Sequence, residues 1–272
     1  MSDVPQITLN NGVEIPQLGF GVWQVSTEDI VASVATALQV GYRHIDTAAI
    51  DGNEEGVGRA IAASGVTRHE LFVTTKLWNA EHGNAESAFE ASLRKLGLDH
   101  VDLYLIHWPA PGNDRYLDAW RSMEKIYASG RARAIGVSNF QPHHLRRLLA
   151  ETTVPPAVNQ VEVHPTFANA DVLAANAEHG VVTEAYSPLG LAADLEAPAI
   201  VTIAERLGRT PAQVILAWHL RAGRIVFPKS VTPSRIAENF DVFDVELTDV
   251  DVTEINALDS GNRMGLHPDD FD

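Results

Sequence analysis

Asp46, Lys76 and His107 each stand near the end of a short apolar segment, and the three segments follow one another along the chain. Charged groups at the ends of apolar strands are costly to desolvate unless they are paired. Taken one at a time, these residues are most simply explained as a structural ion pair and a hydrogen-bonded core histidine. Their equivalent positions on successive segments instead favour a single active site on which all three converge.

A second group of residues has the chemistry of a phosphate site. Lys229 and Ser230 end the last apolar segment, and Arg235 follows close behind. An ammonium, a hydroxyl and a guanidinium so close together suit a phosphate monoester, above all where a helix begins. The stretch 206–237 supports this interpretation, because it holds six basic residues and no acid in a chain whose net charge is −16.

The elements that must position these residues alternate regularly. Eight apolar segments have the length and composition of strands: Leu18–Trp23, His44–Ala48, Leu71–Leu77, Val101–His107, Ala134–Ser138, Ala157–Glu162, Val181–Tyr186 and Ile225–Pro228. Seven helical patterns lie between them, and two more follow the last strand: Thr27–Val40, Glu54–Ser64, Asn84–Leu96, Tyr116–Ser129, Pro142–Ala150, Asn169–His179, Pro211–Arg221, Pro233–Phe240 and Asp249–Leu258.

This alternation predicts an α/β fold, a closed (β/α)8 TIM barrel rather than an open doubly wound sheet, in one domain of residues 1–272. Glycines follow four of the helical patterns, as left-handed helix ends favour: Gly41, Gly97, Gly130 and Gly180. Function in such a barrel lies at the carboxyl ends of the strands. The later strands supply further polar residues at or near these ends: Ser138, Asn139, Gln160, Tyr186 and Ser187.

An N-terminal β-hairpin precedes the barrel. Ile7–Leu9 and Val13–Ile15 alternate in hydrophobicity around Asn10-Asn11-Gly12, and the Asn-Gly pair predicts a tight primed turn.

Composition excludes several classes of protein. With 45% hydrophobic and 21% charged residues, the 272-residue chain can bury a large core and is not intrinsically disordered. The net charge of −16 opposes binding to nucleic acid or to an anionic membrane surface. The lack of cysteine excludes disulfides, thiolate metal sites and cysteine nucleophiles.

Sequence motifs for other functions are missing. No apolar run approaches the length of about 18 residues that spans a bilayer, and no secretory signal is visible, so we expect a cytoplasmic protein. No strand–GxGxxG–helix pattern predicts a Rossmann site, and no GxSxG motif predicts a serine nucleophile. Histidine and glutamate do not cluster at the spacing of metal ligands, so no metal site is predicted.

Five motifs in order resemble those of the aldo-keto reductases: Gly41–Ala48, Thr74–Trp78, Leu105–Pro109, Gly136–Phe140 and Phe227–Ser230. The resemblance covers essentially the whole chain. It is closest to the bacterial 2,5-diketo-D-gluconate reductase branch, which is similar also in the string Asn53–Gly58. It implies NADPH-dependent reduction of a small-molecule carbonyl to an alcohol by a monomeric barrel, with a C-terminal tail over the active-site face.

The resemblance also implies a role for individual residues. Asp46, Lys76 and His107 match the catalytic group of the family. Residues that match its cofactor site are Ser138, Asn139 and Gln160 at the nicotinamide carboxamide, Tyr186 stacked on the ring, Lys229, Ser230 and Arg235 at the 2′-phosphate, and Glu238 and Asn239 near the adenine. Ser187, Leu189 and Val231 are further residues of that cofactor site. Trp23, Trp78 and Trp108 would wall the substrate pocket.

The fourth member of the family's catalytic group is missing, because Asp51 stands at the position of its tyrosine. That tyrosine donates a proton to the carbonyl oxygen as hydride arrives. A carboxyl has a pKa near 3.9, and we expect Lys76 to lower the pKa of Asp51 further, so that an anion replaces the acid. Loss of a general acid commonly costs a factor of about 10²–10⁴ in rate. The resemblance with this departure therefore predicts a reductase that keeps its fold and its cofactor but is impaired in carbonyl reduction.

Alternatives stay open at this point. His107 or a water could supply the proton. The chain could be a non-catalytic NADPH-binding module or a deliberately inactivated variant of a reductase. An unrelated barrel enzyme could hold a phosphorylated substrate through Lys229 and Arg235. A second departure is the segment Leu189–Pro198, which is a few residues shorter than in similar reductases and would fold over the cofactor pyrophosphate.

Overall fold

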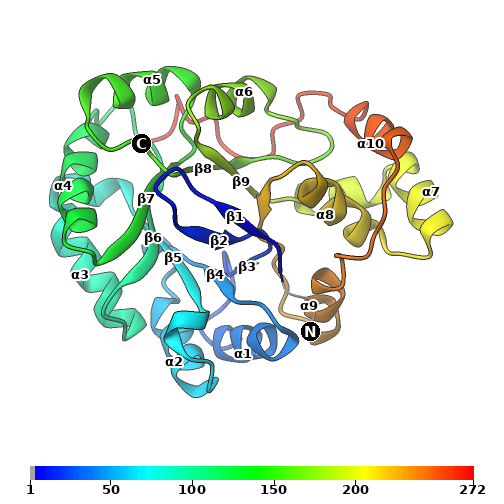
Figure 1. Ribbon diagram of the computed structural model, residues 1–272, viewed down its shortest axis with the longest axis horizontal. Coiled ribbons are helices and arrows are strands. Elements are labelled where there is room, and N and C mark those ends of the chain that lie inside the picture. Colours follow the sequence, from blue (N-terminus) through cyan, green and yellow to red (C-terminus); the bar gives the residue numbers. More distant parts are fainter. Residues whose placement is uncertain (1–3) are drawn as a thin grey trace.

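The computed structural model describes residues 4–272, and an eight-stranded parallel sheet forms its centre. The strands run in the order of the chain: β3 (Phe20–Gly21), β4 (His44–Asp46), β5 (Phe72–Leu77), β6 (Val101–Ile106), β7 (Ala132–Ser138), β8 (Val158–Glu162), β9 (Val182–Tyr186) and β10 (Ile225–Val226). A parallel bridge between Leu18 and Val226 links the start of the sheet to its end. The predicted (β/α)8 barrel is confirmed (Figure 1).

Helices surround the barrel (Figure 1). They are α1 (Ile30–Val40), α2 (Glu54–Ala63), α3 (Ala85–Leu96), α4 (Tyr116–Ala128), α5 (Pro142–Glu151), α6 (Ala170–Glu178), α7 (Pro198–Leu207), α8 (Pro211–Arg221), α9 (Pro233–Phe240) and α10 (Asp249–Asn256). Short 3₁₀ helices add η1 (Ala49–Asp51), η2 (Arg68–Glu70), η3 (Asn79–Asn84) and η4 (Gly190–Glu196). All predicted helices are present.

Helix α7 was not predicted, although its ends carry ordinary signals. Pro198 stands in its first turn, and Gly208 ends it with a φ of 63°. The sequence interpretation placed Pro198 in a loop over the cofactor, which hid these signals. The prediction that Gly41, Gly97, Gly130 and Gly180 end helices is confirmed, since each has the positive φ that helix ends favour.

The hairpin of β1 (Gln6–Thr8) and β2 (Glu14–Pro16) covers one end of the barrel. Its Leu9 and Ile15 join the apolar cluster that fills the barrel interior. The predicted primed turn is wrong, because only Gly12 has a positive φ and a type I′ turn needs two such residues. The loop instead has three residues and closes with Leu9 and Val13 hydrogen bonded.

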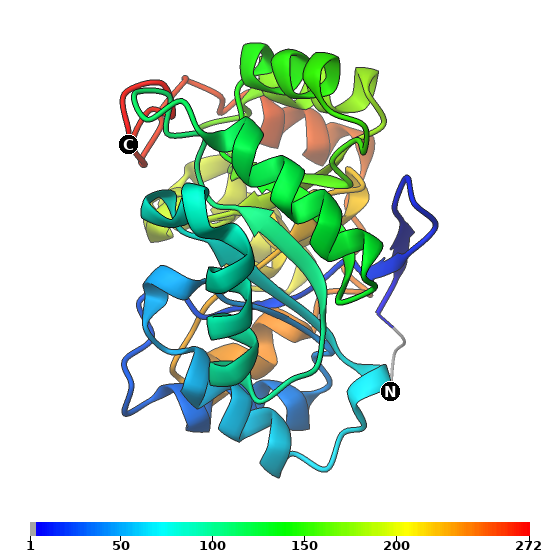
Figure 2. The ribbon, with the colours of Figure 1, turned by 90° about the vertical axis from the view of Figure 1, so that its left-hand side faces the viewer.

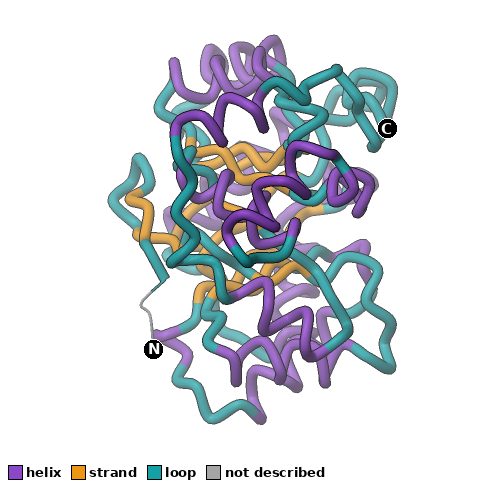
Figure 3. The backbone as a smooth tube through the Cα atoms, turned by 90° about the vertical axis from the view of Figure 1, so that its right-hand side faces the viewer, coloured by secondary structure: helices purple, strands orange, loops and turns teal. Residues whose placement is uncertain are grey.

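The hairpin and the C-terminal tail lie at opposite ends of the barrel (Figures 2 and 3). The carboxyl ends of the strands therefore face the tail. No helix within residues 4–272 has both the length and the apolarity required to cross a membrane.

Candidate active site

Asp46 and Lys76 form a buried ion pair. Asp46 ends β4 and stands opposite Thr74 on β5, so Lys76, two residues further along, projects from the same face. The Lys76 ammonium donates to both carboxylate oxygens of Asp46, at 2.8 and 2.7 Å, and to the carbonyl of Thr47 at 3.0 Å. All three N–H groups of the lysine are therefore occupied.

His107 follows β6 and stays neutral at physiological pH. Burial, and then the positive charge of Lys76, lower the pKa of His107 well below its ordinary value. Its Nδ1 is buried without a hydrogen-bond partner among residues 4–272. The ring lies edge-on to Trp78, with 5.4 Å between the ring centroids. A neutral imidazole in this position can hydrogen-bond a substrate oxygen without placing a second cation beside Lys76.

Asp51 ends the 3₁₀ helix η1 directly after β4 and makes no ion pair with the described residues. Burial raises the pKa of Asp51 to about 6, and this outweighs the opposing effect of Lys76. The expectation that this pKa would lie below its ordinary value is wrong, because Lys76 does lower it but burial of the carboxyl raises it by more. Asp51 is therefore still mainly an anion at pH 7, but about half of it is protonated when the pH falls to about 6.

The string Asn53–Gly58 anchors the segment that carries Asp51. The Asn53 amide donates to the carbonyls of Val22, at 3.0 Å, and Val25, at 3.3 Å. Gly56 and Gly58 serve close helix packing, since a Cβ on them would lie 2.2 Å from Ile30 and 2.3 Å from the Leu96 carbonyl oxygen. The resemblance in this string therefore reflects support for the site rather than contact with a ligand.

The ends of β7, β8 and β9 form one polar network. Ser138 donates through Oγ to the carbonyl of Gln160 at 2.8 Å. The Asn139 amide donates to the carbonyl of His107 at 3.0 Å, and its Oδ1 accepts from the Tyr186 hydroxyl at 2.8 Å. Asn139 has the left-handed φ of 64°. Strained backbone of this kind concentrates at functional sites, and these four predicted cofactor residues lie together.

The same network reaches the Lys76–Asp46 ion pair through Gln160. Its amide nitrogen donates to Asp46 Oδ1 at 3.0 Å and to Glu184 Oε2 at 3.0 Å. Glu184 was missed by sequence reasoning. An acid in the middle of the buried strand β9 is the signal that could have found it, because a charged residue in such a strand needs an explanation.

Four of the six basic residues in the stretch 206–237 have structural partners. These are Arg206 with Asp251, Arg209 with Asp241 and Asp244, Arg221 with Asp249, and Arg224 with His219 and the ring of Trp218. Lys229 and Arg235 are exposed and have no acidic partner within residues 4–272. Within the stretch 206–237, only Lys229 and Arg235, beside the first turn of α9, therefore keep a positive charge that is free for a ligand.

Their predicted neighbours differ in environment. Val231 is exposed to 46% and Ser230 is buried, with its Oγ accepting from the backbone N–H of Thr232 at 3.0 Å. Glu238 accepts a hydrogen bond from the Thr210 hydroxyl at 2.9 Å, and Asn239 is buried. Glu238 is thus tied to the residue that caps the start of α8.

The C-terminal tail brings a further aromatic ring to the predicted substrate pocket. Phe271 lies 4.7 Å from Trp108 and 6.1 Å from Trp78, measured between ring centroids. The side chain of Trp23 is 53% exposed and makes no ring contact with the described aromatic residues. The predicted position of the tail over the active-site face agrees with these contacts.

A buried histidine joins the tail to the segment after β9. His164 is bonded through Nε2 to Glu162, at 3.0 Å, and through Nδ1 to Asp194 in η4, at 2.9 Å. The Glu162 carboxylate also accepts from the backbone N–H groups of Met264 and Gly265, at 2.6 and 2.8 Å. We call these three side chains, Glu162, His164 and Asp194, the clasp.

The clasp is ionic at neutral pH. Burial opposes charge on His164, but the hydrogen bonds to Asp194 and Glu162 outweigh it and raise the pKa of His164 to about 9. Burial likewise opposes charge on the two acids, yet their bonds to His164 and to backbone N–H groups lower the pKa of both. The clasp therefore weakens only as pH rises through about 9 or falls into the acidic range.

Asp194→Asn is expected to loosen the segment that begins at Leu189. Leu191 and Ala192 there have left-handed φ values of 49° and 75°, so the segment holds strained backbone. A hydrogen bond to a charged group is worth about 1.5–3 kcal/mol, so opening and proteolytic cleavage of this segment should become roughly ten- to a hundredfold faster. Asp249→Asn, at a nearly fully exposed acid, should leave cleavage unchanged. Equal rates for both variants would contradict a role for the clasp.

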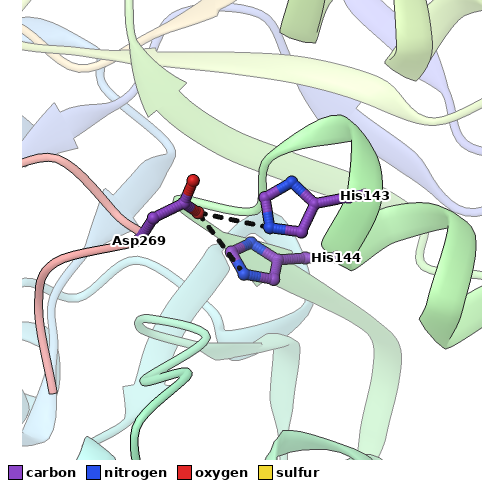
Figure 4. Close-up of side chains that lie close together, drawn as sticks. All are labelled: His143, His144 and Asp269. Atoms are coloured by element: carbon purple, nitrogen blue, oxygen red, sulfur yellow. Dashed lines mark ion pairs between the residues drawn. The ribbon is translucent and has the colours of Figure 1, made fainter.

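His143, His144 and Asp269 also come together, between α5 and the tail (Figure 4). Their geometry resembles a metal site, with both Nε2 atoms near Asp269 Oδ1, at 3.3 and 3.5 Å. His144 Nδ1, however, accepts from the backbone N–H of Gln141 at 3.2 Å. In neutral His144 the proton must then sit on Nε2, which donates to Asp269 and is not free to bind a metal. The cluster is a hydrogen-bonded anchor for the tail.

Known proteins resemble the chain over its whole length. The model of the aldo/keto reductase family matches residues 17–260. An aldo-keto reductase of Mycolicibacterium smegmatis is 52% identical over 98% of this chain and 98% of its own. The methylglyoxal reductase DkgA of Escherichia coli is 49% identical over 100% of this chain and 99% of its own. A Bombyx mori aldo-keto reductase, solved in complex with NADP, has a TM-score of 0.93 at 37% identity and covers 100% of this chain and 98% of its own.

Proposed function

Because the chain belongs to the aldo/keto reductase family of NADP-dependent oxidoreductases, we propose that it reduces a small aldehyde or ketone to an alcohol with NADPH. The observation that carries this proposal is the buried Lys76–Asp46 pair, which Gln160 joins to the polar network at the ends of β7 to β9. The name of the relative DkgA makes methylglyoxal the first substrate to try.

The residues present suit a nicotinamide cofactor, which when bound supplies the hydride. The side-chain amide of Gln160 donates both of its hydrogens inward, to Asp46 and Glu184. Its side-chain oxygen Oε1 is left as an acceptor for the N–H of a carboxamide. Tyr186 is held by Asn139 at the end of β9, where its ring is available for stacking. Lys229 and Arg235 provide two exposed cations for a 2′-phosphate.

Proton donation is the weak step of the proposed reaction. Lys76 is fully engaged by Asp46 and Thr47, and neutral His107 can orient the carbonyl oxygen. Asp51, at the position of the family's tyrosine, is mostly ionised at neutral pH and then has no proton to give. We therefore expect slow turnover at pH 7 with intact cofactor binding.

The direct test follows NADPH oxidation with a panel of small carbonyls that includes methylglyoxal. Slow but measurable oxidation supports a reductase weakened at Asp51. Tight NADPH binding without oxidation of any carbonyl, even after Asp51→Tyr, would instead support a non-catalytic NADPH-binding module. Failure to bind NADPH together with binding of a sugar phosphate would favour an unrelated barrel enzyme.

Lys229→Ala and Arg235→Ala are each expected to weaken NADPH binding about ten- to a hundredfold, since each removes a charge-assisted contact worth about 1.5–3 kcal/mol. NADH, which has no 2′-phosphate, should bind these variants and the unsubstituted chain nearly alike. Arg221→Ala, in the same basic stretch but paired with exposed Asp249, is the matched control. Fluorescence titration measures all of these affinities. Equal losses for NADH and NADPH would contradict the assignment.

We further propose that residues 1–272 form one catalytic domain, which acts as a monomer in the cytoplasm. The continuous barrel, with no linker between its repeats, supports the single domain. The net charge of −16 opposes nucleic acid and anionic membranes as partners.

A further inference from the structure

Glu184 is a buried acid that the proposed reaction does not use. It lies in β9, in register with Gln160 on β8 and Ile225 on β10, and its side chain is fully buried. Its Oε2 accepts from the Gln160 amide at 3.0 Å. Its Oε1 is buried and has no hydrogen-bond partner within residues 4–272. An ionised carboxylate left this way would be strongly destabilised.

The charges around Glu184 leave it without a counterion. Asp46 on β4 and Lys76 on β5 neutralise each other. Other ionisable groups of strands β4, β6 and β8 are engaged elsewhere: His44 with Thr74 and the Pro16 carbonyl, Asp102 with Arg68 and Arg133, and Glu162 with His164. The short strands β3 and β10 contain no titratable residue.

Glu184 therefore holds a proton at neutral pH. Burial, and then the negative charge of Asp46, raise the pKa of Glu184 to about 8, against smaller opposing effects of Gln160 and Lys76. The side-chain amide of Gln160 thus contacts protonated Glu184, the carboxylate of Asp46 and, under the proposed function, the carboxamide of the cofactor.

We propose that Glu184 is a positioning residue that senses the oxidation state of the cofactor through Gln160 and releases its proton when the oxidised form binds. The inference rests on the proposed function, which places the nicotinamide ring at Gln160. The oxidised ring carries a positive charge that the reduced ring lacks, and a cation near a buried acid favours its ionised form. When NADP⁺ binds, Glu184 then loses its proton to solvent, and the complex contains an ionised Glu184. Binding of NADPH leaves Glu184 protonated.

This linkage fixes the sign of a pH dependence. Because NADP⁺ lowers the pKa of Glu184, affinity for NADP⁺ rises with pH up to about 8 and is constant above that. NADPH affinity does not rise in the same range. The ratio of the two dissociation constants cancels the titration of the 2′-phosphate and of the residues that hold it. Between low and high pH, this ratio should shift in favour of NADP⁺ by about tenfold for each unit by which the oxidised ring lowers the pKa of Glu184.

The test measures both dissociation constants between pH 6.5 and pH 9 for the unsubstituted chain, for Glu184→Gln and for Glu178→Gln. Glu184→Gln keeps the size and the acceptor for Gln160 but cannot ionise, so its ratio should not change with pH. Glu178→Gln removes an exposed acid on α6 and should behave like the unsubstituted chain.

Calorimetry on the unsubstituted chain makes the test independent of whether Glu184→Gln folds. Binding of each cofactor is measured at pH 7.5 in two buffers that differ in heat of protonation. We expect net proton release with NADP⁺ and none with NADPH. Binding of both cofactors with equal proton release, or a ratio that varies with pH in Glu184→Gln as it does in the unsubstituted chain, would overturn the inference alone. Failure to bind either cofactor would overturn the proposed function.

Discussion

Asp51→Tyr is expected to raise the rate of carbonyl reduction by about 10²–10⁴-fold at pH 7, the usual contribution of a general acid. The substitution replaces an anion by a phenol, which under the proposed function is the group that donates the proton to the carbonyl oxygen. Asp51 ends a one-turn helix and makes no ion pair among the described residues, so the exchange breaks no structural contact of that kind. Steady-state oxidation of NADPH with methylglyoxal measures the gain.

Asp51→Phe separates proton donation from loss of charge, because it removes the anion but supplies no proton. A gain as large in the phenylalanine variant as in the tyrosine variant would contradict the role of the phenol. The unsubstituted chain offers a second check. Its residual turnover should rise as pH falls through about 6, since the carboxyl of Asp51 then gains the proton that it can donate. Asp51→Asn should show no such rise.

The barrel and the arrangement of its strand ends were predictable from local patterns. Period, composition and helix-end glycines are properties of short segments, and a regular repeat of strand and helix has few ways to close. Asp46 and Lys76 therefore fell on the same face of two neighbouring strands once the strand order was known. The network of Asn139 and Tyr186 followed for the same reason, because both stand at strand ends.

Interactions between distant parts of the chain were not predictable. The acids that occupy most of the basic stretch 206–237 come from the following segment, and only the fold shows which arginines they leave free. The clasp joins His164 to Asp194 across 30 residues. The pKa of Asp51 was predicted in the wrong direction, since the sequence shows that Lys76 is near but not that burial of the carboxyl outweighs its charge.

Asp46→Asn is expected to lower the free energy of unfolding by about 3–5 kcal/mol, the usual result of leaving one member of a buried ion pair without its partner. The amide keeps Oδ1 as an acceptor for Gln160 and for one N–H of Lys76, but it loses the acceptor Oδ2 together with the negative charge. Urea denaturation measures the difference. Glu86→Gln, which removes an acid from an exposed pair with Lys125, should cost less than about 1 kcal/mol.

The double substitution Asp46→Asn with Lys76→Met distinguishes an unpaired charge from damaged packing. It removes both charges, and buried pairs replaced by apolar groups commonly lose little stability, so much of the loss should be recovered. The single variant should also regain stability as pH rises toward 10. An unpaired buried lysine has a lowered pKa and sheds its proton below the value of about 10.4 that it has in the unfolded chain. The folded state is then no longer penalised for a charge that the unfolded state carries freely. A deficit in Asp46→Asn that stays constant from pH 7 to pH 10 would show that the carboxylate acts through shape and hydrogen bonding rather than through charge.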